Sequence, residues 1–310
     1  MKVVFMGTPD FAVGILEAIV NSRHEVVLAV TQEDKPKGRS DKLLPPPVKE
    51  YALEHGIPVF QPHRIKEKES VDELRKYEAD IYVVAAFGQI LSEEILNIPR
   101  YGCINTHASL LPKYRGAAPI QWAIVDGEAK TGVTIMQMDK GLDTGDILYT
   151  SVVEISASDT GESLFDKLAV SGASLIIEAL DRIEAGDCNP KKQDESKATY
   201  AKILNKKMGC IDFTKKAIEI ERLIRGFTPW PGTYTYYNGK LLKVFSAVVQ
   251  SEQYPEYKPG DVVCVEDNRL LVKTGEGVLV IDEVQLEGKK RMMVSDFVRG
   301  YRIKVGDHLG

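Results

Sequence analysis

The order of apolar and polar positions divides the chain into two parts with different patterns. In the first part, short apolar runs at 2–6, 25–30 and 81–86 alternate with helical patterns, among them 11–20 and 164–183. Strands that alternate with helices predict a mostly parallel sheet with helices on both of its faces. The continuous β-rich run at 81–86 is typical of a strand that is buried on both sides.

The pattern changes after a polar, lysine-containing stretch that ends near residue 206. Five short alternating segments, separated by glycine and proline turns, lie at 233–237, 241–249, 261–265, 269–273 and 278–286. This pattern of short segments and turns is typical of a small β-barrel. We therefore predict an α/β fold, with a doubly wound, mostly parallel sheet at 1–188, a linker at 189–206 and a small β-barrel of the oligonucleotide-binding (OB) type at 207–310.

Composition narrows the class of protein. Apolar residues make up 44% and charged residues 27% of the chain, which is ordinary for a globular protein. No apolar run approaches the roughly 18 residues of a membrane span, and the N-terminal residues have neither a signal-peptide nor a transit-peptide layout. The cysteines contain no C-x-x-C pair, so neither a zinc site nor a disulfide framework is indicated. We expect a cytoplasmic protein with no membrane and no metal.

The net charge of −5 is divided unevenly. Residues 1–206 hold 24 Lys and Arg against 31 Asp and Glu, whereas residues 207–310 hold 16 against 14. The second part, at +2, is therefore the better candidate to face a polyanion, although the asymmetry is modest.

Asn105 and His107 are separated by one residue at the end of a predicted strand. Side chains alternate across a strand, so these two point to the same side. In a parallel sheet, the carboxyl end of the strand faces the crevice where α/β folds bind ligands. Taken alone, the pair is better explained by a strand-end turn and a histidine with ordinary hydrogen-bond partners.

A second candidate loop, 138–145, carries Asp143 between two glycines. Alone, it too is better explained as a β-turn that contains an aspartate. Together with Asn105 and His107, however, Asp143 could form an acyl-transfer site without a covalent intermediate. The amide donates to a carbonyl oxygen that gains charge, an imidazolium stabilises that oxyanion, and the carboxylate orients the histidine and relays protons. One His, one Asn and one Asp are not a convincing set of metal ligands.

Two motifs make this hypothesis specific. The first reads Asn-x-His-x-Ser-Leu-Leu-Pro at 105–112 and continues as Tyr-Arg-Gly-Ala-Ala-Pro-Ile at 114–120. The second reads Gly-Val-Thr-Ile-Met-Gln-Met-Asp at 132–139, followed by Gly-Leu-Asp-Thr-Gly at 141–145. In both motifs the chain resembles the folate-dependent formyltransferase family. The likeness extends to Gly-Thr-Pro-Asp-Phe-Ala near the start and to Phe-Thr-Pro-Trp-Pro-Gly in the second part, so it covers essentially the whole chain.

The resemblance implies a reaction and the residues that perform it. It implies formyl transfer from 10-formyltetrahydrofolate to the free amine of initiator Met-tRNA, with Asn105, His107 and Asp143 as catalytic residues. It also implies a folate-binding set: Phe87, Gly88, Gln89, Ile90, Leu91, Ser109, Leu110, Leu111, Pro112 and Asp139. The glycine turn after the first strand lacks G-x-G-x-x-G spacing, so we expect no NAD.

A long loop at 32–48 is the candidate RNA contact of the first part. A loop of this length is usually functional or disordered, and composition alone is equally compatible with a solvated charged loop. In the family that the chain resembles, the matching loop is basic and enters the acceptor end of the tRNA, with Arg39 at the key position. The residues proposed to bind tRNA are Lys35, Lys37, Arg39 and Lys42 in this loop, and Lys206 and Lys207 before the barrel.

Four other functions remain as alternatives. A glycinamide-ribonucleotide formyltransferase would end near the linker, a formyltetrahydrofolate hydrolase would pass the formyl group to water, and a sugar-nucleotide formyltransferase would need a nucleotide pocket in the second part. The basic loop favours tRNA over these three. The fourth alternative is a binding protein without catalysis, and the intact Asn, His and Asp set speaks against it. We expect the enzyme to be a monomer.

Overall fold

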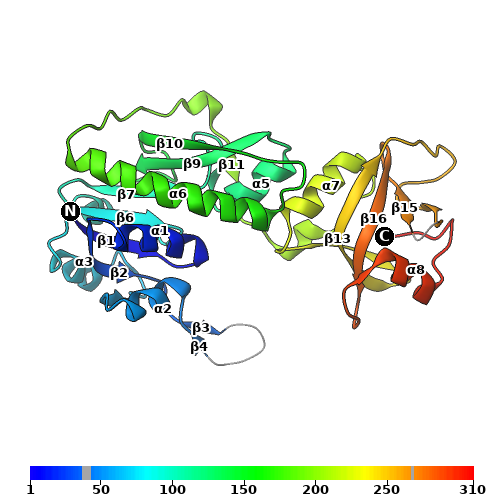
Figure 1. Ribbon diagram of the computed structural model, residues 1–310, viewed down its shortest axis with the longest axis horizontal. Helices are drawn as coiled ribbons and strands as arrows, with labels where there is room; N and C mark the ends of the chain where they lie inside the picture. The colour runs from blue at the N-terminus through cyan, green and yellow to red at the C-terminus, as the bar shows by residue number, and fades with distance from the viewer. Residues whose placement is uncertain (37–42, 267–268) are drawn as a thin grey trace. The chain divides into compact units, whose positions relative to one another are not determined.

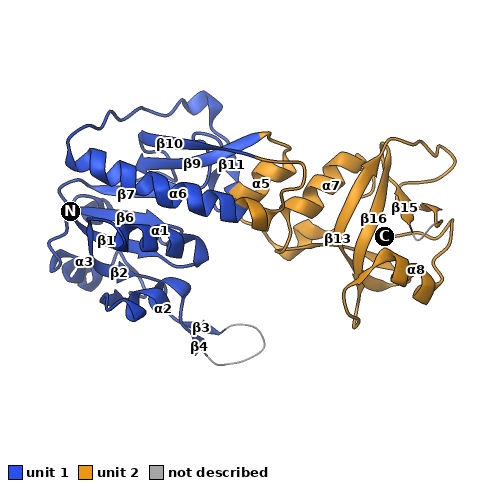
Figure 2. Ribbon diagram, viewed as in Figure 1, with its two compact units in different colours: residues 1–119, 130–154, 165–201 blue, residues 120–129, 155–164, 202–310 orange. Residues whose placement is uncertain are grey.

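The computed structural model describes residues 1–36, 43–266 and 269–310. The chain divides into two compact units, which Figure 2 shows in different colours. Unit 1 comprises residues 1–119, 130–154 and 165–201, and unit 2 comprises residues 120–129, 155–164 and 202–310. The chain thus enters unit 2 and returns to unit 1 twice before the third and longest segment of unit 2 begins.

Unit 1 is built on a seven-stranded sheet with the order β10-β9-β7-β6-β1-β2-β5. The five strands from β7 to β5 run parallel, and β9 is antiparallel to both β7 and β10. The strands are β1 (Lys2–Gly7), β2 (Glu25–Val30), β5 (Val59–Phe60), β6 (Ile81–Ala85), β7 (Cys103–His107), β9 (Lys130–Gln137) and β10 (Ile147–Glu154).

Helices cover both faces of this sheet (Figure 1). On one face, Leu74 of α3 (Lys68–Arg75) and Ile95 of α4 (Glu93–Leu96) share a buried core with the alternate residues Val4, Met6 and Tyr82 of the strands. On the other face lie α1 (Asp10–Val20) and α6 (Gly161–Glu184), and α2 (Pro47–Glu54) packs beside α1. The predicted α/β class with a doubly wound, mostly parallel sheet is confirmed.

The strand order reverses between β1 and β6, since the chain runs from β1 to β2 and β5 on one side and from β6 to β7 on the other. Open α/β sheets bind ligands beyond the carboxyl ends of the strands at such a reversal. Here that edge carries Thr8 after β1, Phe87 after β6 and His107 at the end of β7. The motif residues therefore lie at the edge that the topology makes available.

The segment expected to act as a linker carries regular structure. Lys191 forms a bridge with Ile147 of β10, and the 3-10 helix η1 (Glu195–Lys197) follows. Next, β11 (Tyr200–Ala201) pairs in parallel with β8 (Arg115–Gly116). Residues 189–201 of the expected linker therefore belong to unit 1, where β11 lies beside the strand β8 of the first motif.

Unit 2 contains a curled antiparallel sheet with the order β12-β13-β16-β15-β14, and β17 pairs with β16. Its strands are β12 (Thr233–Tyr237), β13 (Lys240–Gln250), β14 (Val262–Cys264), β15 (Leu270–Lys273), β16 (Val278–Leu286) and β17 (Met292–Met293). Ile220 and Ile224 of α7 (Ala217–Gly226) and Phe297 of α8 (Val294–Tyr301) fill its core. The predicted OB-like barrel is confirmed.

The helix α5 (Pro119–Val125) is the first passage of the chain into unit 2. Trp122 packs edge-to-face on Phe227, with their ring centroids 6.1 Å apart, and its indole N–H donates to the carbonyl of Lys202. Gly226, at the end of α7, lies so close to α5 that an added Cβ would be 2.8 Å from Val125. The two helices therefore share an interface that admits only glycine at this position.

Candidate active site

The strand β7 presents Asn105 and His107 on one face at its carboxyl end. Cys103, two residues earlier on the same face, is buried in the core, where burial raises the pKa of its thiol to about 12. Asn105 lies opposite Val84 of β6 and Met136 of β9, so strands on both sides fix its backbone. Because side chains alternate along the strand, the buried Cys103 and the polar pair lie on one face, and the pair lies at the edge of the sheet.

The loop after β9 brings Asp143 to this pair. Asp143 Oδ1 accepts a hydrogen bond from Asn105 Nδ2 at 3.3 Å, and Asp143 Oδ2 accepts one from the backbone N–H of Gly116 at 2.8 Å. Asp143 Oδ2 also lies 3.6 Å from His107 Nδ1. The three residues that the motifs predicted are thus brought together, although 38 positions separate Asn105 from Asp143.

His107 is held between two hydrogen-bond acceptors. Its Nε2 lies 2.9 Å from the carbonyl oxygen of Tyr114, and its Nδ1 faces the Asp143 carboxylate. The histidine is only 6% exposed. Both ring nitrogens of His107 therefore face oxygen atoms, and a ring nitrogen that carries a proton can donate to them.

Asp143 also determines how the Asn105 amide is turned. A carboxylate only accepts hydrogen bonds, so the nitrogen of the amide, not its oxygen, faces Asp143. The same nitrogen carries a second N–H, which a substrate carbonyl oxygen can accept. An amide donor, an imidazole and a carboxylate at one point can stabilise an oxyanion and move a proton.

The predicted folate segment 87–91 follows β6 and is fixed by side chains from elsewhere. The carbonyl oxygen of Phe87 accepts hydrogen bonds from Thr8 Oγ1 at 3.2 Å and Gln32 Nε2 at 3.0 Å. Gln89 turns away and binds the backbone N–H of Ile65 through its Oε1. Gly88 has a φ of +81°, and an added Cβ would lie 2.3 Å from Gln32 Nε2, so the position requires glycine.

The side chains of this segment point in different directions. Phe87 and Leu91 are buried, whereas Ile90 is 80% exposed. An apolar side chain that is this exposed beside a polar site is a candidate surface for a flat ligand.

The Ser-Leu-Leu-Pro stretch is anchored to β9. Ser109 is buried, and its hydroxyl donates to the carbonyl of Lys113 at 2.6 Å. Thr134 Oγ1 donates to the carbonyl of Ser109 and accepts from the N–H of Leu111, so one hydroxyl holds both ends of the turn. The Leu111–Pro112 peptide bond is cis. Leu110 contacts β9, since an added Cβ on Gly132 would be 2.6 Å from its side chain.

Asp139 uses its carboxylate within its own loop. Its Oδ1 accepts from the N–H of Gly141 at 2.9 Å and from Thr144 Oγ1 at 2.7 Å. These bonds shape the loop that carries Asp143, and a folate contact by Asp139 remains a prediction.

The residues predicted to bind tRNA fall in three places. Lys35 lies in β3 (Lys35–Pro36), which pairs with β4 (Leu43–Leu44), and its ammonium donates to Gln32 Oε1. Lys206 and Lys207 are exposed in the 3-10 helix η2 (Lys206–Gly209) of unit 2. Three further predicted residues lie outside the described residues: Lys37, Arg39 and Lys42.

Four contacts of the site were not predicted from the sequence. The backbone of Tyr114 and Gly116 supplies an acceptor to His107 and a donor to Asp143. The side chain of Gln193 donates to the carbonyls of Asp143 and Gly145 at 2.8 and 2.7 Å. The Tyr-Arg-Gly stretch was part of the first motif, which is a signal for it, whereas Gln193 lies in a polar stretch without any pattern.

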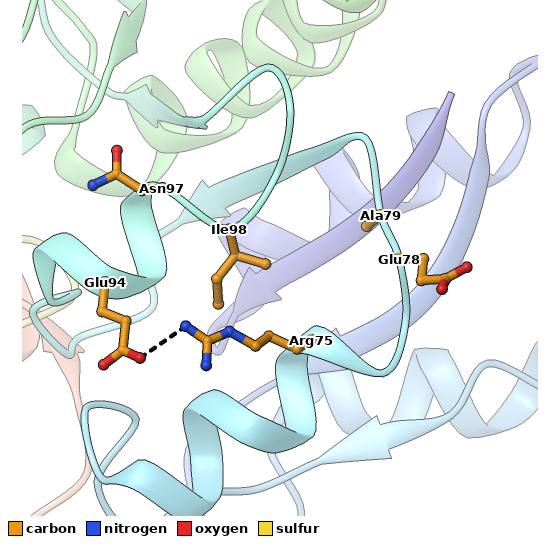
Figure 3. A pocket seen from close by; sticks show the side chains of 6 residues that line it. All are labelled: Arg75, Glu78, Ala79, Glu94, Asn97 and Ile98. Carbon is orange, nitrogen blue, oxygen red and sulfur yellow. Dashed lines mark hydrogen bonds and ion pairs between the residues drawn. The ribbon is translucent and has the colours of Figure 1, made fainter.

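A separate surface hollow lies at the opposite end of the parallel strands. It is lined by residues that precede β6 and β7, and Figure 3 shows Arg75 reaching across it to Glu94, which it meets at 2.8 Å. Ligands of open α/β sheets bind at the carboxyl ends of the strands, so this hollow is not the candidate active site. The residues that line it are Arg75, Glu78, Ala79, Glu94, Asn97 and Ile98.

Metal binding and membrane crossing were two possible properties of the described residues. Within residues 1–36, 43–266 and 269–310, no group of three His, Cys, Asp or Glu side chains is arranged to hold a metal ion. Among the helices of the described residues, none combines the length and apolar character that crossing a membrane requires.

Sequence comparisons identify the family. The sequence profile described as formyl transferase matches residues 1–180, and that of the formyl transferase C-terminal domain matches residues 203–302. The methionyl-tRNA formyltransferase of Lachnospira eligens is 55% identical over 314 residues, which cover 100% of both chains. That of Agathobacter rectalis is 54% identical over 306 residues, covering 99% of this chain and 98% of its own. The chain belongs to the methionyl-tRNA formyltransferase family.

Two proteins of more distant sequence share its fold. A Helicobacter canadensis N-formyltransferase, solved with folinic acid and dTDP-3-aminofucose, has a TM-score of 0.67 and 20% identity over 94% of this chain and 100% of its own. HypX from Aquifex aeolicus, solved with tetrahydrofolic acid, has a TM-score of 0.57 and 18% identity over 82% of this chain and 44% of its own. The fold is therefore shared by proteins solved with folates, one of them also with an amino-sugar nucleotide.

Proposed function

We propose that this chain transfers the formyl group of 10-formyltetrahydrofolate to the free α-amine of methionyl-initiator-tRNA. The products are N-formylmethionyl-tRNA, for translation initiation, and tetrahydrofolate. The observation that carries the proposal is the contact set of Asp143, which binds Asn105 and faces His107 at the carboxyl edge of the sheet. The same chain matches methionyl-tRNA formyltransferases over their whole length.

Each of the three residues has a role that follows from its contacts. Asn105 donates its second N–H to the formyl oxygen as that oxygen gains negative charge. His107, held between two acceptors, places a positive charge beside the same oxygen. Asp143 takes the proton of the attacking amine, through water, and passes it to the leaving folate nitrogen. The new bond joins the amine nitrogen to the formyl carbon, and the bond from that carbon to the folate nitrogen breaks.

The segment 87–91 supports the choice of folate as the donor. Hydrogen bonds from Thr8 and Gln32 fix its first carbonyl, and Gln89 fixes its middle, so the backbone is held in one conformation. A rigid backbone with an exposed Ile90 suits a flat heterocycle that carries its own donors and acceptors.

A row of aromatic and basic residues in unit 2, partly exposed, supports tRNA as the acceptor. Tyr234 of β12 lies opposite Lys243 of β13, and Tyr236, two residues along, is 40% exposed. The bridge between Cys210 and Tyr234 places the end of η2, which carries Lys206 and Lys207, beside the same strand. Aromatic rings that stack on bases, flanked by lysines that meet phosphates, are the usual means by which OB-type barrels bind RNA.

A formyl-transfer assay tests the reaction. We expect purified protein to formylate initiator Met-tRNA when 10-formyltetrahydrofolate is supplied, and to leave the folate unchanged when tRNA is omitted. Release of formate without tRNA would identify a hydrolase instead. Transfer to glycinamide ribonucleotide or to an amino-sugar nucleotide, in preference to Met-tRNA, would also overturn the proposal.

The basic loop provides the test of tRNA recognition. Arg39→Ala should slow formylation of Met-tRNA at subsaturating tRNA and leave folate binding unchanged. A lost phosphate contact flattens the log-log salt dependence by about one unit for every tRNA, whereas lost recognition of an open acceptor end affects the initiator most. Arg100→Ala is the control, because Arg100 stacks on Tyr101 before β7, at the far edge of the sheet. Wild-type rates in the Arg39 variant would remove the loop from the proposal.

A further inference from the structure

Arg115 is a fully buried cation that binds two side chains of the segment before β11. It is 0% exposed. Its Nε and Nη2 both donate to Gln193 Oε1, at 3.1 and 2.7 Å, and its Nη1 and Nη2 donate to the two oxygens of Glu195, at 2.9 and 2.7 Å. These bonds raise the pKa of Arg115 and lower the pKa of Glu195, so both groups stay charged. The guanidinium therefore fixes the position of Gln193 firmly.

The bond to Arg115 determines which way the Gln193 amide is turned. Arginine only donates, so the amide oxygen must face it and the amide nitrogen must face the other way. On that side the nitrogen meets two carbonyl oxygens of the catalytic loop, that of Asp143 at 2.8 Å and that of Gly145 at 2.7 Å. Both N–H groups of the amide are thus used on the loop that carries Asp143.

This loop needs an external restraint. Asp143 has a φ of +54°, in the left-handed region that a residue with a Cβ seldom adopts. Such a conformation persists where the surroundings hold it. Gln193 holds the backbone on both sides of Thr144, and the N–H of Gly116, the residue after Arg115, holds the Asp143 carboxylate. The strand pair β8 and β11 joins these two supports.

We propose that Arg115 and Gln193 are positioning residues for Asp143: Arg115 orients the Gln193 amide, and this amide sets the loop so that the carboxylate meets Asn105 and His107. The inference rests on the proposed formyl transfer at these three residues. Neither Arg115 nor Gln193 is assigned any contact with substrate.

Gln193→Glu separates positioning from folding. The new carboxylate still accepts from Arg115, so the anchor is retained, but it has no N–H for the carbonyls of Asp143 and Gly145. We expect kcat to fall about tenfold to a hundredfold, since a displacement of about 1 Å at a reacting group costs that much. The KM values for both substrates and the melting temperature should stay near wild type. Asp194→Ala is the matched control, because the Asp194 side chain bonds within its own turn, to Ser196 and Lys197.

A double-mutant cycle tests whether Gln193 acts through Asp143. Adding Gln193→Glu to Asp143→Ala should cause no further loss of kcat, because the group that Gln193 positions is already gone. Hydrogen exchange at 138–146, followed by mass spectrometry, should be faster in Gln193→Glu and unchanged in Asp194→Ala, whatever the activity.

Three outcomes would overturn the inference: wild-type kcat in Gln193→Glu, an effect on KM alone, or an undiminished loss in the Asp143→Ala background. A wild-type enzyme that transfers no formyl group would instead refute the proposed function. The exchange measurement would then still decide whether Gln193 holds the loop.

Discussion

The substitution Asp143→Asn tests how strictly the site depends on a carboxylate. The carboxylate accepts from two donors, Asn105 Nδ2 at 3.3 Å and the Gly116 N–H at 2.8 Å. Asparagine has one acceptor oxygen. The Gly116 N–H is part of the backbone and cannot turn, so the new oxygen must face it, and the new amide nitrogen then meets the nitrogen of Asn105. Asn105 relieves this conflict only by reversing its amide, which removes its N–H from the formyl oxygen.

The magnitude follows from that reversal. Loss of one donor to a developing oxyanion costs about 100-fold to 1,000-fold in kcat, or roughly 2.7–4 kcal/mol. The variant also loses the negative charge 3.6 Å from His107. We therefore expect a fall of at least about 100-fold in kcat at saturating folate and Met-tRNA, measured by steady-state formylation, with a normal thermal melt. Asp187→Asn, the same charge change on the surface of unit 1, should have no effect. A kcat within threefold of wild type in Asp143→Asn would refute the reasoning.

Three further predictions concern the strand and its surroundings. Asn105→Ala and His107→Ala should each lower turnover by at least about 100-fold while the protein stays folded. Steady-state kinetics and thermal melts measure the two effects. Near wild-type turnover in His107→Ala would remove the histidine from the mechanism. Gly132→Ala should lower the free energy of unfolding in urea by about 1–3 kcal/mol or more, because the new Cβ would lie 2.0 Å from a carbonyl oxygen of β10. Burial raises the pKa of Cys103 to about 12, so at pH 8 its protonated thiol should resist Ellman's reagent until the protein is unfolded. Exposed Cys210 should react in the folded protein. Rapid labelling of Cys103 in the folded protein would contradict this burial.

The sequence alone predicts those parts of the site that depend on local backbone geometry. Asn105 and His107 are two positions apart on a strand, and a period of two puts them on one face whatever the rest of the chain does. Asp143 is different. Its approach to Asn105 depends on a left-handed backbone conformation and on a contact across 38 positions, so the hypothesis that joined the two became specific only through the resemblance to a known family.

Gln193 shows why the remainder could not be predicted. It lies in a polar stretch without periodicity, and its function comes from a buried arginine 78 positions earlier in the chain. The same holds for α5. An apolar helix face has the same pattern whether it packs on the neighbouring sheet or on a helix formed a hundred residues later, so alternation and composition gave no sign that 120–129 belongs to unit 2.

Because α5 belongs to unit 2, it cannot complete its packing when it is first synthesised. On the ribosome, the strands and helices of unit 1 emerge first, but Trp122 and Val125 pack on Phe227 and Gly226, which are synthesised about a hundred residues later. The apolar side of α5 therefore stays uncovered until these partners leave the exit tunnel, and transiently exposed apolar surface is prone to aggregation. A gene truncated after codon 201 would encode α5 without Phe227 and Gly226. Such a product would therefore keep the apolar side of this helix exposed, because the residues it packs on would be missing.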